Sequence, residues 1–214
     1  MISLSEQAYE HLKNMIVHNK LNYGEIYSET KLAKEIGISR TPFRDAIHHL
    51  VQEGYIDIIP SKGFQLHQLT KQDVIETFQV RSALECFCTV EIAKDYQSER
   101  SKTVFENLSF CLEKMREIMN SSRSIEDFCK YDFQFHTEII DYLENNQFTT
   151  VYGGFLYRMK RLAALSLSHE RRMEEACKEH QAILDTMRSG NTKNIYEITM
   201  THMDIPKWSN LADL

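Results

Sequence analysis

The stretch SETKLAKEIGISRTPFRDAIHHLVQEGYIDIIPSKGFQL, residues 28–66, decides the fold of the N-terminal part of this chain. Its first half predicts two short helices, over 29–36 and about 41–53, each preceded by a serine that can cap the first turn. Gly37 lies between them, where a glycine readily takes the left-handed conformation that ends a helix. Two helices joined by such a tight turn are typical of a helix-turn-helix.

The segments on either side complete this unit. Upstream, apolar residues at helical spacing predict a helix over 5–19. Downstream, the β-prone runs YIDIIP (55–60) and GFQLHQL (63–69) flank Ser61-Lys62-Gly63 and predict a hairpin. Three helices followed by a hairpin form a winged helix-turn-helix, in which the last helix contacts DNA bases with its N-terminal end.

The distribution of glycine and proline marks a domain boundary. Six of the ten Gly and Pro residues lie within 24–63, so turns are frequent there and long helices follow. We therefore expect one domain over 1–69 and a second over 70–214. The second is expected to be an all-α bundle of six or seven helices, which makes the protein mainly α. Its helices are expected at about 71–96, 98–120, 124–143, 147–167, 169–189 and 192–204.

The charge of the chain does not by itself indicate a nucleic-acid partner. The net charge is −6, and residues 1–68 carry 7 Lys and Arg against 8 Asp and Glu. DNA binding must therefore depend on locally clustered cations rather than on a basic domain.

Composition also predicts a cytoplasmic protein. No apolar run reaches the roughly 18 residues of a membrane span, so no membrane partner is expected. The N-terminus alternates apolar with charged residues, unlike a signal or transit peptide. The five cysteines include no CxxC pair and are expected to be reduced, mostly buried thiols, with a thiol switch as the alternative.

The segment ISRTPFRDA (38–46) resembles the G-V-S-R-T-P-V-R-E-A motif of the GntR family of bacterial regulators. The resemblance covers the whole N-terminal domain and implies binding to double-stranded operator DNA. It implies contacts to bases or phosphates from Ser39, Arg40, Thr41, Arg44 and the wing residues Lys62 and Gly63. Thr30 and Lys62 stand where many members carry arginine, and the threonine removes a positive charge. An arginine pair without this motif would more simply be a solvated helix face.

Four residues of the second domain form a candidate ligand set. Asp132 and His136 lie four residues apart on one helical face, within an aromatic segment. His180 and His202 each lie within a helical segment, beside apolar residues. A carboxylate and three imidazoles that converge would suit a divalent transition metal such as Zn, Ni, Mn or Fe. Each histidine taken alone is more often a core or surface residue.

This set resembles the metal ligands of the FCD domain, which follows the GntR wing in the FadR subfamily. The family pattern is D-x-x-x-H, then E-H, then a histidine about 22 residues later, and all four positions are filled here. The resemblance further implies a small, carboxylate-bearing effector beside the metal. Arg81 is the foremost candidate for its countercharge, with a structural salt bridge to Glu85 as the competing role. Two further candidates are Arg158 and Arg161.

These observations predict a transcription regulator, most simply a homodimeric repressor whose operator affinity responds to the effector. One alternative is a metal-dependent hydrolase that activates a water in the same site. Against it, no further Glu or His near the four ligands stands out as a general base, and an enzyme has no need of the wing. A second alternative is a regulator whose C-terminal domain only dimerises.

Overall fold

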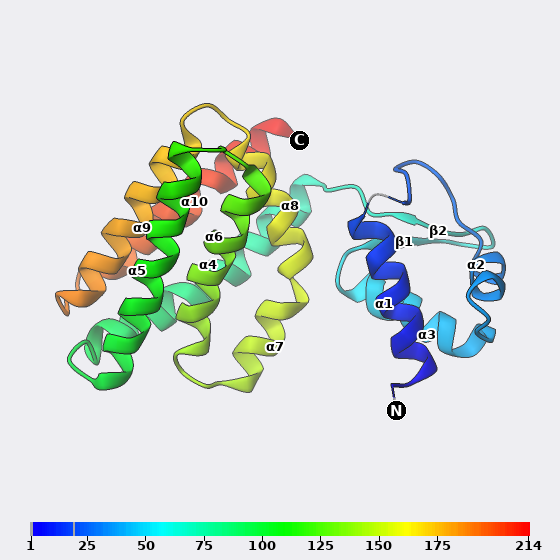
Figure 1. Ribbon diagram of the computed structural model, residues 1–214, viewed down its shortest axis with the longest axis horizontal. Coiled ribbons are helices and arrows are strands. Elements are labelled where there is room, and N and C mark those ends of the chain that lie inside the picture. The colour runs from blue at the N-terminus through cyan, green and yellow to red at the C-terminus, as the bar shows by residue number, and fades with distance from the viewer. Residues whose placement is uncertain (1, 19) are drawn as a thin grey trace. The chain divides into compact units, whose positions relative to one another are not determined.

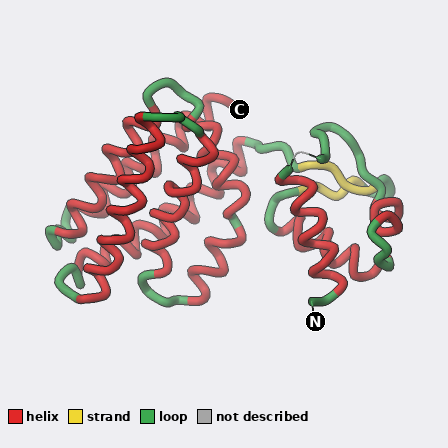
Figure 2. The backbone as a smooth tube through the Cα atoms, in the orientation of Figure 1, coloured by secondary structure: helices red, strands yellow, loops and turns green. Residues whose placement is uncertain are grey.

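The computed structural model describes residues 2–18 and 20–214 and divides into two compact units (Figure 1). The first is Met1–Leu69 together with Gly154–Arg158, and the second is Thr70–Gly153 with Met159–Leu214. Helices dominate both units, and the strands of the described chain occur in the first (Figure 2). No helix among the described residues is both long and apolar enough to cross a membrane.

The first unit is the predicted winged helix-turn-helix. The strands pair antiparallel, with Ile56 opposite Leu66 and Ile59 opposite Gly63. The last residue of the predicted first helix, Asn19, lies outside the described residues. The elements are α1 (Leu4–Val17), α2 (Glu29–Glu35), α3 (Arg40–Gln52), β1 (Ile56–Ile59) and β2 (Gly63–Leu66).

Local signals explain where these helices begin and end. The Ser28 hydroxyl accepts a hydrogen bond from the Lys31 amide, which confirms the predicted cap of α2. Gly37 has a φ of +72°, the left-handed conformation expected after that helix. Ser39 is the N-cap of α3 by position, but its side chain makes no capping hydrogen bond.

The core of the first unit forms on one face of α3. Phe43, Ala46, Ile47 and Leu50 are buried there at the i, i+3, i+4, i+7 spacing of an amphipathic helix. They pack with residues of α1 and of the hairpin in one hydrophobic cluster. The opposite face of α3 is consequently left to solvent.

The second unit contains seven helices among the described residues, within the predicted range of six or seven. Thr70 caps the first of them in a capping box with Asp73, as its sequence position predicts. The first helix packs against the third, the sixth and the seventh of these helices. The seven are α4 (Lys71–Lys94), α5 (Glu99–Asn120), α6 (Ile125–Asp141), α7 (Asn146–Gly154), α8 (Leu156–Leu167), α9 (Arg172–Arg188) and α10 (Ile195–Asp213).

Two predicted helix boundaries were wrong. The expected helix over 147–167 is two helices, α7 and α8, because consecutive glycines at 153 and 154 weaken helical structure where α7 ends. The last helix does not stop at 204 but continues through Pro206 to Asp213. A proline inside a helix costs about 3 kcal/mol, and here burial of Met203, Pro206 and Asn210 on the inner face opposes that cost.

Candidate metal centre and DNA-binding surface

Three helices bring the three predicted histidine ligands together inside the second unit, and the fourth predicted ligand, Asp132, lies beside one of them. Asp132 and His136 both point inward from α6, and His180 from α9 and His202 from α10 are buried with them. One ring nitrogen from each histidine lies within 4.8 Å of the corresponding atoms of the other two. Asp132 Oδ1 lies 3.5 Å from His180 Nε2. The convergence of the three histidines agrees with the resemblance to the FCD ligand set, since spacing alone had placed only Asp132 and His136 on one face.

The distances fit a small metal ion. His136 Nε2 lies 3.2 Å from His180 Nε2 and 3.3 Å from His202 Nε2. Tetrahedral zinc with Zn–N distances of about 2.0–2.1 Å places its nitrogens about 3.3 Å apart. The distances from His136 to the other two rings thus already match those between ligands of a tetrahedral site.

The electrostatics of the cluster also favour metal binding. Burial lowers the pKa of His180 well below its ordinary value, and the neighbouring histidines lower it further. Burial lowers the pKa of His202 as well, against the opposing effect of Glu179. Neutral imidazole is the form that binds a metal, so burial keeps these two ligands in the competent state.

A buried carboxylate lies behind His136. Glu85 Oε2 is 2.6 Å from His136 Nδ1, a short contact whose angles are not those of a regular hydrogen bond. Arg81 Nε and the Tyr152 hydroxyl both donate to the other oxygen, Glu85 Oε1, at 2.9 and 3.1 Å. Burial opposes ionisation of Glu85, but Arg81 and His136 outweigh it and lower the pKa of this carboxyl to about 2. Glu85 is therefore an anion beside the ligand ring.

A second carboxylate contacts His202, here through a regular hydrogen bond. Glu179 Oε2 lies 2.6 Å from His202 Nδ1, and Arg172 donates to both oxygens of Glu179 at 2.7 and 2.8 Å. Burial again opposes ionisation, but His202 and Arg172 lower the pKa of Glu179 to about 2. An ionised carboxylate only accepts hydrogen bonds, so His202 presents Nδ1–H to Glu179 and leaves its Nε2 lone pair for the cluster. His180 Nδ1, by contrast, is buried and has no hydrogen-bond partner among residues 2–18 and 20–214.

The sequence predicted only some of these contacts between the glutamates, their arginines and the ligand rings. The salt bridge from Arg81 to Glu85, one of the two roles considered, is present. Glu85 and Glu179 both contact ligand rings, and neither was singled out from the sequence as a partner of a ligand. Each is paired with an arginine, so neither is a free glutamate of the kind that the hydrolase alternative requires. Arg172 was missed, although its position seven residues before Glu179 places both on one helical face.

A small cavity adjoins the cluster. Its volume is about 30 Å³, and its lining includes Asp132, His136 and His202 together with Arg81 and Arg172. Arg81, the foremost candidate for the countercharge of an effector, is thus among the residues that line this cavity.

The other two arginine candidates are not part of that lining. Arg158 groups with the first unit, where its side chain lies so close to Gly54 that a Cβ at this glycine would overlap it. Arg161 lies on α8. Their expected role in effector binding stays a prediction.

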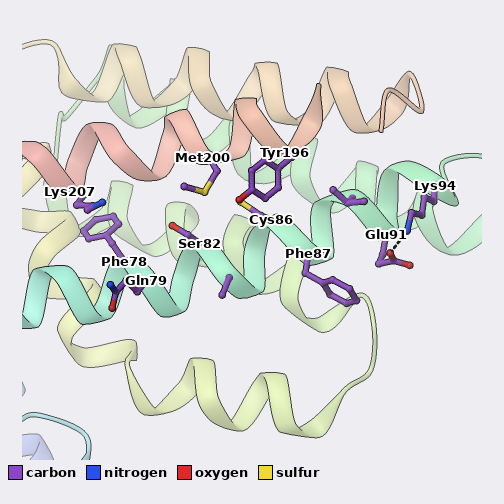
Figure 3. A pocket seen from close by; sticks show the side chains of 12 residues that line it. Phe78, Gln79, Ser82, Cys86, Phe87, Glu91, Lys94, Tyr196, Met200 and Lys207 are labelled. Atoms are coloured by element: carbon purple, nitrogen blue, oxygen red, sulfur yellow. Dashed lines mark hydrogen bonds and ion pairs between the residues drawn. The ribbon is translucent and has the colours of Figure 1, made fainter. Parts of the chain in front are cut away.

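A wider groove of about 640 Å³ runs along α4 and α10 (Figure 3). Its lining is mostly apolar, with Phe87 from α4 and Met200 from α10, and includes none of the four candidate ligands. Phe78 borders both this groove and the small cavity. Size alone favours the groove as a binding site, but the small cavity has the convergent charges and ligand atoms, so we place the candidate site there.

The predicted DNA-binding residues lie on the surface of the first unit. Arg40, Thr41 and Arg44 are exposed at the N-terminal end of α3, and neither guanidinium forms an ion pair with another described residue. Lys62 is exposed at the hairpin turn, where Ser61 and Gly63 have positive φ angles. These side chains are free to meet phosphates and base edges.

Gly63 has a structural role that the sequence did not reveal. Its φ is +133°, and a Cβ there would overlap the carbonyl oxygen of Tyr27. The Tyr27 and Phe64 amides each donate to the carbonyl of the other residue, at 2.7 and 3.0 Å, and join the loop before α2 to the hairpin. Glycine is therefore required at this position for the fold of the wing, whatever contact it makes with DNA.

Comparison with known proteins identifies the class to which this fold and site belong. Residues 4–66 match the bacterial regulatory proteins of the gntR family, and residues 76–205 match the FCD domain. The chain therefore belongs to the GntR family of bacterial transcription regulators and carries an FCD domain behind its winged helix-turn-helix.

Individual relatives agree with this class. The HTH-type transcriptional regulator YdhC of Bacillus subtilis (strain 168) is 26% identical over 92% of this chain and 87% of its own length. The gluconate operon transcriptional repressor of the same organism is 29% identical over 83% of this chain and 70% of its own. A crystal structure of a transcriptional regulator GntR from Rhodococcus sp. RHA1 shares the fold, with a TM-score of 0.75 at 15% identity over 98% of both chains. The family and these relatives are regulators, not enzymes.

Proposed function

We propose that this regulator is a repressor whose affinity for operator DNA is controlled by a small carboxylate effector bound beside a divalent metal in the FCD domain. The observation that carries the proposal is the convergence of three buried imidazole nitrogens within 4.8 Å of one another. Its relatives include a repressor of a gluconate operon, which supports repression as the mode of action. Binding to chromosomal operators implies that the protein acts in the cytoplasm.

Asp132, His136, His180 and His202 would hold the metal, with Zn, Ni, Mn and Fe all compatible with this donor set. A bound divalent ion would supply positive charge and open positions for an anionic ligand. Glu85 and Glu179 orient two of the rings through Nδ1, which raises the basicity of their Nε2 atoms. Arg81, which lines the adjoining cavity, would pair with the effector carboxylate.

DNA recognition would use two copies of the chain. A homodimer places two α3 helices in successive major grooves of a palindromic operator. Arg40 and Arg44 would contact guanines or phosphates, with Ser39 and Thr41 supporting them and Lys62 near the backbone. An effector that binds one arrangement of the dimer more tightly than another changes operator affinity by that difference in binding free energy.

The test combines metal analysis with DNA binding by the full-length chain. Elemental analysis of the purified protein should find one transition metal per chain, which His136→Ala, His180→Ala and His202→Ala each remove. His169→Ala is the matched control, because this exposed histidine of the same domain pairs with Asp213 away from the cluster. Metal content that the cluster variants leave unchanged contradicts the metal site. A gel shift on upstream DNA that is unaffected by Arg40→Ala and Arg44→Ala contradicts the DNA-binding surface.

A further inference from the structure

Two buried hydrogen-bond donors beside the cavity have no partner. Ser166 Oγ on α8, with the residue only 2% exposed, and Arg172 Nε at the start of α9 both lack an acceptor among the described residues. Both residues line the cavity that adjoins the ligand cluster. The other two nitrogens of Arg172 each donate to Glu179, so Nε is the nitrogen of this guanidinium that has no partner among the described residues. A buried donor without an acceptor is costly and points to a ligand that supplies one.

The charges around the cavity define the charge of that ligand. Arg81 is offset by Glu85, and Arg172 is offset by Glu179. Asp132 offsets one of the two charges of a divalent ion, so a single positive charge is left. One monoanion neutralises the site, whereas a dianion leaves an uncompensated negative charge in a buried region, which is unfavourable.

The cavity also limits the size of the ligand. A water molecule needs roughly 10–15 Å³ of such space, and the cavity offers about 30 Å³. About two or three water-sized groups therefore fit, so a ligand of four or five non-hydrogen atoms needs small movements of the lining side chains and a larger one needs more. A long-chain or multi-ring ligand is therefore disfavoured in this arrangement of the helices.

Resting on the function proposed above, we infer that the effector is a compact monocarboxylate that carries a second, uncharged oxygen. Its carboxylate lies toward Arg81 and the ligand cluster. Its second oxygen accepts hydrogen bonds from Ser166 Oγ–H and Arg172 Nε–H. Ser166 and Arg172 are thus specificity-determining residues that distinguish this ligand from a plain carboxylate and from a dicarboxylate.

Calorimetry on the zinc-loaded, full-length chain tests this inference with three probes. Acetate carries only the carboxylate, glycolate adds a neutral hydroxyl oxygen, and malonate adds a second charge. Glycolate should bind about 5- to 10-fold more tightly than acetate, as expected for one or two additional hydrogen bonds, and more tightly than malonate. Ser166→Ala should lower the glycolate-to-acetate ratio several-fold.

The serine variant is suited to this test because it removes a hydroxyl that has no partner, so it should fold like the parent chain. Ser168→Ala is the matched control, since this serine lies two residues further on and is exposed. Three results would overturn the inference. The glycolate-to-acetate ratio is unchanged in Ser166→Ala, malonate binds most tightly of the three probes, or none of the probes binds. The zinc content of the wild-type chain distinguishes failure of this inference from failure of the proposed metal site. A chain that retains zinc but gives one of these results contradicts only the inference, whereas a chain that does not retain zinc contradicts the metal site.

Discussion

Replacement of Glu179 by glutamine should weaken metal binding without touching a ligand. The carboxylate contacts His202 Nδ1 at 2.6 Å and accepts two hydrogen bonds from Arg172. Glutamine has one carbonyl oxygen, and its amide group faces one of these donors, so at least one contact is lost. Loss of such an outer partner of a metal-bound histidine typically lowers metal affinity about 10- to 100-fold, equivalent to about 1.4–2.8 kcal/mol.

Competition with a chromophoric chelator measures this change in zinc affinity directly. Glu175→Gln is the matched control on the same helix, because Glu175 is 57% exposed and lies 4.0 Å from the same arginine. A pair that is this exposed contributes little, so the control should match the wild type. Thermal unfolding of the metal-free protein shows separately whether an unpaired Arg172 destabilises the fold. An affinity of Glu179→Gln within twofold of the wild type refutes the role assigned to Glu179.

Three further outcomes are expected. Arg40→Ala and Arg44→Ala should each weaken operator binding by about 1–3 kcal/mol in a gel shift, with unchanged thermal stability because both side chains are exposed. Gly63→Ala should destabilise the first unit by about 1–3 kcal/mol, since its Cβ meets the Tyr27 carbonyl; Gly24→Ala, also at positive φ but in open space, should cost less in the same melt. The five cysteines are buried, and burial raises the pKa of each thiol to about 11 or 12, so thiol reagents at neutral pH should react only after unfolding. Rapid reaction of the native protein would instead favour the thiol switch.

Most helices were predictable because their signals are local. Caps such as Ser28 and Thr70 and the glycine turn at residue 37 depend on neighbours within four residues. The boundaries that were wrong depend on distant packing. Pro206 remains inside α10 because its surroundings are buried, and no property of the nearby sequence reveals that burial.

The candidate site was predictable to a similar extent. The spacing of Asp132 and His136 on one helix identifies a shared face, and the pattern of the remaining histidines resembles a known ligand set. Which glutamate contacts which histidine ligand could not be predicted from the sequence in the same way. Glu179 lies next to His180 in the chain, yet it contacts His202, 23 residues away. Ser166 carries no sequence signal at all.

The sequence by itself determined the helices, the hairpin, the exposed arginines of α3 and the residue types that could bind a metal. These follow from backbone preferences and from the periodicity of apolar residues, which act over a few positions. Only the tertiary structure decided which glutamate orients which histidine, which arginines border the cavity and which donors remain unpartnered. Those contacts join different helices, and packing, not sequence separation, sets the distances between them.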